Sequence, residues 1–153
     1  MSASGLDVFD KTLQTTHVWL DEIMDRLGCE RRAAWHILGA VLRTLRDRIP
    51  VDLAAHLGAQ LPLLVRGLYY DQWHPGAERR KWRSLDEFQA VVADGLADMK
   101  PVDPGDAALA VFQVLNHFVD PGQVAHVRNA LPEEVRRQWP QNNADLSAAQ
   151  SAA

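Results

Sequence analysis

The sequence predicts an all-α fold, a helical bundle of about eight helices built from two four-helix repeats that a pseudo-two-fold axis relates. Three observations predict it. Apolar residues recur at steps of three and four along nearly the whole chain, which is the pattern of helices with one buried face. Prolines and capping side chains stand where new helices would begin. No run alternates apolar and polar residues for long enough to predict a strand.

The first repeat, residues 6–73, contains four predicted helices. Gly28 is expected to end the first, because glycine takes the left-handed conformation of a helix end at low cost. Pro50 and Pro62 have no backbone N–H to donate, which suits the first turn of a new helix. The first helix is therefore expected to end at about residue 27, and the next three to cover about residues 30–49, 50–57 and 63–73.

The second repeat, residues 84–139, shows clear helix starts. Ser84 and Glu87 form a Ser-x-x-Glu capping box. Asp103-Pro104 and Asp120-Pro121 each place a capping acid before a proline at the first helical position. Leu131-Pro132 opens the last helix. The three helices after the capping-box helix are expected at about residues 104–119, 121–130 and 132–139.

The predicted core follows from the apolar faces of these helices. The second helix is expected to carry Arg32, Arg43 and Arg46 on its outer face. Residues 140–153 are small and polar, which predicts a disordered tail. The residues expected in the core are Phe9, Leu13, Leu20, Leu38, Val41, Leu42, Leu45, Phe112, Leu115 and Phe118.

The two repeats resemble each other beyond their shared helicity. We interpret this as an ancient duplication whose two copies pack face to face, because each copy alone would have a thin apolar core. The matching segments are Leu6-Asp7-Val8-Phe9 with Leu85-Asp86-Glu87-Phe88; Leu38, Val41, Leu42 and Leu45 with Val111, Val114, Leu115 and Phe118; and Ala55-His56-Leu57 before Leu61-Pro62 with Ala125-His126-Val127 before Leu131-Pro132.

The connector between the repeats, residues 74–83, is polar and ends in a basic run. Its last six residues carry four basic side chains and one acidic, whereas the residues after it carry four basic and ten acidic. Aromatic and arginine side chains dominate interface energetics, so one interpretation is a contact surface. In the other, Tyr69, Tyr70 and Trp73 anchor the connector on the core and the basic side chains stay hydrated. The candidate contact surface comprises Arg66, Tyr69, Tyr70, Trp73, Arg79, Arg80, Trp82 and Arg83.

Several segments of the first repeat are distinctive. They are the opening Phe9-Asp10-Lys11-Thr12-Leu13, the turn at residues 43–50, and residues 53–73 with their Gln-Leu-Pro and Arg-Gly-x-Tyr-Tyr segments. In these segments the chain resembles a bacterial family of unknown function, DUF2267, over roughly residues 6–139. The resemblance implies a helical bacterial domain. It implies no known activity, substrate or cofactor, and therefore no functional residues.

No motif for catalysis, cofactor or metal binding stands out. The nine glycines are scattered, so no phosphate-binding loop is predicted. His17 and Asp21 are one helical turn apart, but two ligands are too few for a metal site. His56 and His126 hold equivalent repeat positions and could meet near the axis, although such pairs more often order helix ends. Cys29 lies near a helix start, which lowers a thiol pKa. No base is identifiable beside it, and a lone cysteine is more often inert packing.

These observations favour a non-enzymatic module that acts by binding a protein partner or by self-association. The alternative is a small-molecule binder with a pocket between the repeats. Nucleic-acid binding through the basic connector is disfavoured, because the acidic second half would repel a polyanion. An enzyme of unfamiliar type ranks last. The chain shows neither a signal peptide nor an apolar run of the ~20 residues that a membrane span needs, and its single cysteine fits a reducing compartment, so we expect a cytoplasmic protein.

Overall fold

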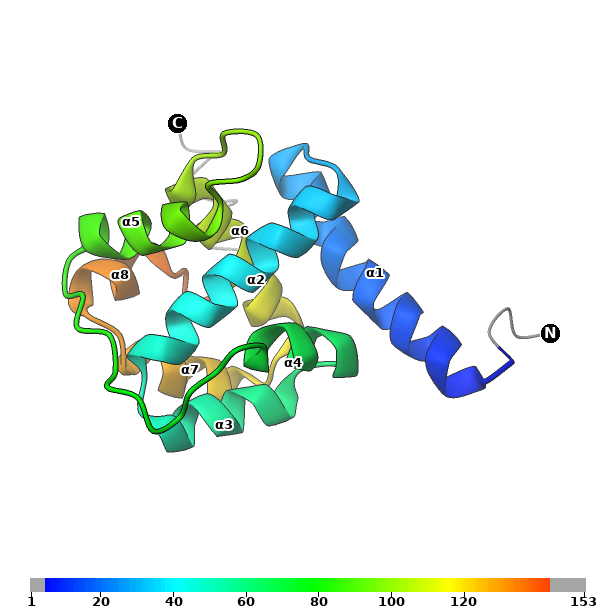
Figure 1. Cartoon of the computed structure of the whole chain (residues 1–153), viewed down its shortest axis with the longest axis horizontal. Helices are drawn as coiled ribbons and strands as arrows, with labels where there is room; N and C mark the ends of the chain where they lie inside the picture. Colours follow the sequence, from blue (N-terminus) through cyan, green and yellow to red (C-terminus); the bar gives the residue numbers. More distant parts are fainter. Residues whose placement is uncertain (1–4, 144–153) are drawn as a thin grey trace.

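A computed structural model of the chain describes residues 5–143, and within them it contains eight α-helices and no strand. The predicted all-α fold is therefore confirmed. None of the described helices is long and apolar enough to cross a membrane. The helices are α1 (Asp7–Leu27), α2 (Arg31–Arg48), α3 (Val51–Gln60), α4 (Leu63–Tyr70), α5 (Leu85–Gly95), α6 (Pro104–Phe118), α7 (Pro121–Asn129) and α8 (Glu133–Gln138) (Figure 1).

The helix ends follow the local chemistry of the sequence. Gly28 ends α1 with a φ of 65°, and its N–H donates to the carbonyl oxygen of Met24. Three predicted caps form: the side chains of Ser84, Asp103 and Asp120 accept hydrogen bonds from backbone N–H groups three residues later. The other three helix-starting prolines, at positions 50, 62 and 132, stand one residue before their helices instead of inside the first turn.

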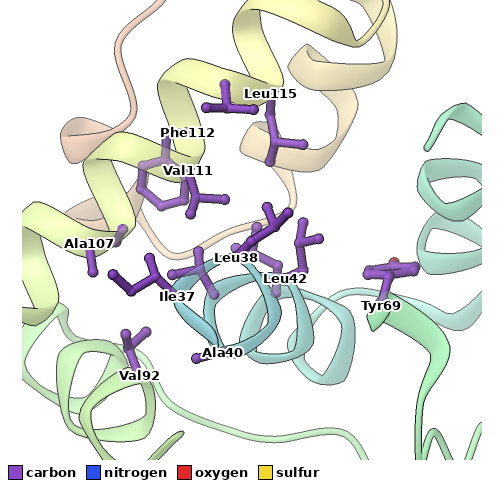
Figure 2. Close-up of a cluster of buried hydrophobic side chains, with 14 of the residues drawn as sticks. Ile37, Leu38, Ala40, Leu42, Tyr69, Val92, Ala107, Val111, Phe112 and Leu115 are labelled. Carbon is purple, nitrogen blue, oxygen red and sulfur yellow. The ribbon is translucent and has the colours of Figure 1, made fainter. Parts of the chain in front are cut away.

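The core lies between α2 and α6, which contact each other at the centre of the molecule (Figure 1). Figure 2 shows the inward side chains of α2, among them Leu38 and Leu42, facing Val111, Phe112 and Leu115 of α6. All five are fully buried. Helices α1 and α5 each contact both central helices, α3 contacts α7, and α4 and α8 lie against α1 and α5 respectively.

Two of the expected core residues are not in the core. Phe9 is 53% exposed and Leu13 is 46% exposed. The cause is visible in Figure 1: the first half of α1 projects beyond the rest of the molecule, so its apolar face finds no neighbouring helix. Phe118 is only partly buried, and it stacks on Trp19 with ring centroids 5.3 Å apart. The other seven expected core residues are buried.

The start of the predicted disordered tail is attached to α6. The side-chain amide of Asn116 donates to the carbonyl oxygen of Pro140 over 2.8 Å, and that of Asn143 donates to the carbonyl oxygen of Gln113 over 2.9 Å. The remaining part of that tail, residues 144–153, lies outside the described residues.

Candidate functional site

The connector crosses the end of α2 on its way from α4 to α5, and backbone hydrogen bonds hold it there. The N–H of Arg80 donates to the carbonyl oxygen of Asp47 over 2.9 Å. The Nε of Arg48 donates to the carbonyl oxygen of Trp82, also over 2.9 Å. The Trp82 side chain is 4% exposed and packs against Phe88, with ring centroids 5.1 Å apart. The connector is therefore fixed at residues 80 and 82.

The aromatic half of the candidate contact surface turns inward. Tyr69 is fully buried, and its hydroxyl donates to the carbonyl oxygen of Ala54 over 2.7 Å. Burial raises the pKa of Tyr69, so its hydroxyl stays a neutral donor. Tyr70 donates to the carbonyl oxygen of Ala55 and stacks on the half-buried Trp73, with ring centroids 5.2 Å apart. These contacts agree with the interpretation in which the aromatic side chains anchor the connector.

Arg66 also serves the fold. Its Nε donates to the carbonyl oxygen of Gly58 over 2.9 Å, and its Nη2 donates to that of Leu61, also over 2.9 Å. Carbonyls at the end of a helix have no partner within the helix. Arg66 therefore closes the end of α3, and the exposed part of the candidate surface is its basic half, Arg79, Arg80 and Arg83.

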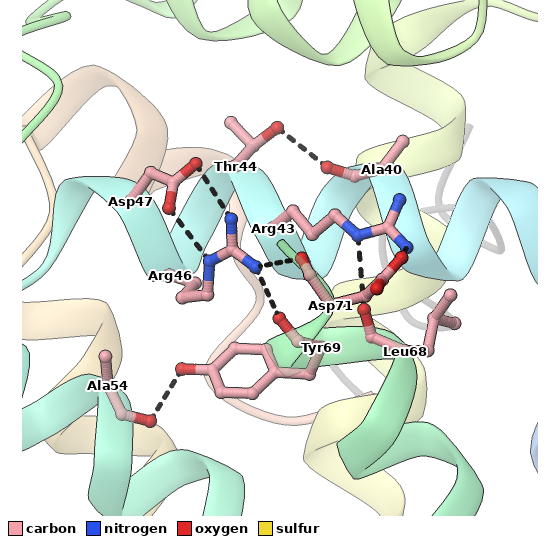
Figure 3. Close-up of polar contacts among 9 residues, drawn as sticks. All are labelled: Ala40, Arg43, Thr44, Arg46, Asp47, Ala54, Leu68, Tyr69 and Asp71. Carbon is pink, nitrogen blue, oxygen red and sulfur yellow. Dashed lines mark hydrogen bonds and ion pairs between the residues drawn. The ribbon is translucent and has the colours of Figure 1, made fainter. Parts of the chain in front are cut away.

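The sequence analysis placed Arg46 on the outer face of α2, but Arg46 is only 6% exposed. Its guanidinium pairs with Asp47 through Nε at 2.8 Å and Nη2 at 3.2 Å (Figure 3). Its Nη1 donates to the carbonyl oxygens of Tyr69 at 2.8 Å and Asp71 at 2.9 Å. The end of α4 covers this flank of α2. Helical periodicity places Arg46 off the apolar face of α2, but it does not predict that the end of α4 packs over that flank.

A basic hollow of about 280 Å³ opens where the connector passes the end of α2. Arg48 lies in its wall, with its guanidinium 5.3 Å from the centre of the Trp82 ring. Burial lowers the pKa of Arg48, and the nearby charges of Arg79 and Arg83 lower it further. The residues that line the hollow are Arg48, Glu78, Arg79, Arg80, Lys81 and Arg83.

Among the described residues that line this hollow, only Glu78 is acidic. Glu78 pairs with Lys81 at 2.8 Å. Within residues 5–143, no ion pair involves Arg48, Arg79, Arg80 or Arg83. Like charges that lie close together without counter-charges repel one another. The hollow is therefore a pre-formed site of positive charge in a chain whose formal net charge is -4.

A second candidate surface is apolar. It was not predicted from the sequence, because two of its residues, Phe9 and Leu13, were expected in the core. It comprises Phe9 and Leu13 on the projecting half of α1 and Leu63 and Leu64 at the start of α4, which we call the α1–α4 apolar surface. Leu63 is 58% exposed and Leu64 is 39% exposed. Helices α1 and α4 contact each other, and α4 lies beside the point where α1 leaves the body (Figure 1).

The histidine and cysteine candidates do not form a reactive centre. The described residues contain no group of three or more His, Cys, Asp or Glu side chains that could hold a metal ion. His56 and His126 are both exposed. Cys29 is half-buried, and burial raises its pKa in spite of an opposing backbone hydrogen bond, so the thiolate that a helix start could favour is disfavoured here.

Comparison with known proteins agrees with the resemblance that the motifs indicated. A search of curated proteins gives no match. The family model described as "Uncharacterized conserved protein (DUF2267)" matches residues 16–137. The matched span begins at Thr16, which is the first buried residue of α1, so it contains the connector but leaves out the projecting half-helix. Because the match covers most of the described helical body, the chain belongs to the DUF2267 family.

Proposed function

We propose that the protein is a non-enzymatic helical module that pairs with a second copy of itself through the α1–α4 apolar surface. One observation carries the proposal. The buried face of α1, which includes Leu20 and Thr16, continues along the same side of the helix to Leu13 and Phe9, which are about half exposed. The sequence thus continues a core-type face beyond the point where residues 5–143 cover it.

The projecting half-helix needs a partner for physical reasons. Short helices are marginal in water on their own, and most helices in proteins are stabilised by packing of their apolar face. Phe9 and Leu13 supply such a face, and Leu63 and Leu64 are exposed at the start of α4, a helix that contacts α1. A partner that packs on this surface would turn an exposed half-helix into a packed one.

The size of the surface fits a dimer. The four side chains are each exposed by 39–58%, which leaves roughly 400 Å² of apolar area in all. A standard interface buries about 800 Å² per partner, of which a little over half is apolar. The surface therefore supplies about the apolar area that one partner of a standard interface contributes.

The shape of the surface favours a second copy as the occupant. A projecting helix and a flanking apolar helix lie on the same chain (Figure 1). A two-fold axis would place each projection against the other copy's α4, so one contact is made twice and the assembly closes. Two-fold dimers are the commonest closed assemblies of identical chains.

Light scattering coupled to size-exclusion chromatography tests this proposal over a range of concentrations. We expect the wild-type mass to rise towards that of a dimer, and the double variant Phe9→Ser/Leu13→Ser to stay monomeric. The matched control is Val18→Ser. Val18 is 50% exposed on the same helix, but nine residues from Phe9 amount to two and a half turns, which puts it on the opposite side.

Two outcomes would remove the proposal. One is a wild-type chain that stays monomeric at every concentration, in which case the surface is free for a different protein partner. The other is a double variant that dimerises as well as wild type. Circular dichroism of each variant checks that the helical content is retained.

We also infer the internal duplication, because equivalent contacts recur in the two halves of the chain. Arg66 donates to the carbonyl oxygen of Leu61 over 2.9 Å, and Arg136 donates to that of Leu131 over 3.0 Å. Both members of the second pair lie seventy positions after those of the first. The ends of α2 and α6, at Arg48 and Phe118, have the same spacing. This register supports two copies of one unit.

The same register revises the matches expected from the sequence. It aligns Leu45 with Leu115, one turn from the expected match with Phe118. Phe88 and Val92 of α5 and Leu96 just after it are buried in steps of four. Trp19, Ile23 and Leu27 of α1 have the same steps sixty-nine positions earlier, one position off the spacing of seventy. Phe88 is 1% exposed and Phe9 is 53% exposed, so they do not hold equivalent places. On this reading the projecting half of α1 is an addition that the second unit lacks.

The alternative, a small-molecule pocket between the two units, has no observation in its favour. The contact between α2 and α6 is filled by fully buried side chains, including Leu38, Leu42, Val111 and Phe112 (Figure 2). A ligand would have to displace them, at a cost of several kcal/mol for each large side chain.

A further inference from the structure

We propose that the basic hollow between α2 and the connector binds the phosphate group of a small molecule. The proposal does not depend on self-association, because the hollow lies at the opposite end of α2 from the turn that joins it to α1. It rests on three features of the hollow: unpaired charge, fixed placement and a neighbouring apolar wall.

The charge in the hollow is unpaired. Arg48, Arg79 and Arg83 form no ion pair within the described residues. Arg48 uses its Nε for the carbonyl oxygen of Trp82, and its two Nη groups donate to no acceptor in that part of the chain. Guanidinium groups present donors in a fork that matches phosphate oxygens. A doubly charged oxyanion would relieve the repulsion between these three arginines.

The Arg48 side chain and the connector backbone are held in place before any ligand arrives. The Arg48 guanidinium lies over the buried Trp82 ring, and the connector is attached to α2 through the N–H of Arg80. A binding site whose groups are already positioned loses less conformational entropy when a ligand binds. The hollow is thus better suited to a specific ligand than a row of solvated lysines would be.

The ligand is expected to carry an organic part beside its phosphate. A second hollow, of about 190 Å³, shares Glu78, Arg79 and Arg80 with the first. Its wall includes Trp73 and Ile49. An aromatic and an aliphatic wall next to a cationic one is typical of small-molecule sites, where a few polar groups orient a mostly apolar contact. Nucleic acid fits less well, because the residues after the connector carry ten acidic and four basic side chains.

Isothermal titration calorimetry tests the site with inorganic phosphate and phenyl phosphate, in buffers whose ionic strength is matched with chloride. We expect saturable binding of both, with phenyl phosphate several-fold tighter because its ring reaches Trp73. Arg79→Gln and Arg83→Gln should each weaken phenyl phosphate about tenfold. Arg32→Gln is the matched control, because Arg32 is an exposed arginine at the other end of α2, and it should leave binding unchanged.

Each contrary result overturns the proposal. One such result is that neither phosphate binds beyond the chloride control. Another is that Arg32→Gln weakens binding as much as Arg83→Gln, which would indicate a diffuse charge effect. A short DNA duplex that binds wild type more tightly than phenyl phosphate, with an affinity that falls steeply with salt, would replace the small molecule with a polyanion. All three variants replace exposed side chains, and their thermal unfolding checks that the fold is intact.

Discussion

Replacement of the buried Arg46 by methionine should destabilise the protein strongly. Methionine replaces the aliphatic stem of arginine but removes the two hydrogen bonds from Nη1 to the carbonyl oxygens of Tyr69 and Asp71 (Figure 3). A hydrogen bond from a charged donor contributes about 1.5–3 kcal/mol. Asp47 is 39% exposed and can be rehydrated, so loss of its ion pair adds at most about 1 kcal/mol. We therefore expect Arg46→Met to lower the free energy of unfolding by about 3–7 kcal/mol.

Urea-induced unfolding, followed by circular dichroism and tryptophan fluorescence, measures this loss. Arg43→Met is the matched control. Arg43 stands one turn earlier and donates to the carbonyl oxygen of Leu68 over 3.1 Å, but its side chain is 37% exposed, so water can replace it. We expect it to cost about 1 kcal/mol or less. An Arg46→Met variant within 1 kcal/mol of wild type, or equal to Arg43→Met, would refute the role given to Arg46.

Two further predictions concern buried side chains in the same manner. Trp139 donates to the Oδ1 of Asn116 over 2.8 Å, whereas the buried Nε1 of Trp82 has no acceptor within the described residues. In urea unfolding, Trp139→Phe should therefore lower the free energy of unfolding by about 1–2 kcal/mol more than Trp82→Phe does. Equal losses would contradict this account. A Cβ on Gly58 would overlap the Tyr70 hydroxyl, so Gly58→Ala should lower the Tm of the wild-type protein. In a Tyr70→Ala background the same substitution should raise Tm, because only the better helix propensity of alanine remains. A Tm change of the same sign in both backgrounds would count against this overlap.

The parts of the fold that the sequence predicts well are those decided within one or two turns. The cap at Ser84 needs only the N–H of Glu87, three residues away, and the end of α1 needs only the backbone freedom of Gly28. The apolar face of each helix is likewise encoded in its own residues. For these features no distant part of the chain has to be known.

The misassigned residues depend on where another element begins or ends. Phe9 and Leu13 lie on the correct face of α1, but none of the eight described helices reaches far enough to cover them. Arg46 lies off the apolar face of α2, but the end of α4 covers it. Local periodicity predicts which face of a helix is apolar, but it does not predict how far a neighbouring helix extends along that face. The same reasoning explains why the basic residues of the connector were predicted as a surface but not as a hollow.

The arginines near the end of α2 differ in what their side-chain donors reach. Arg46 and Arg66 each donate to carbonyl oxygens in or just after a neighbouring helix, where backbone groups lack partners. Arg79 and Arg83 have no such acceptor, although a structured connector fixes their backbone beside Arg48. The fold itself uses Arg48, which donates to the carbonyl oxygen of Trp82, but no contact within the described residues explains why Arg79 and Arg83 lie beside it. Their gathering is accounted for if an anion occupies the hollow, because its charge converts the repulsion into attraction.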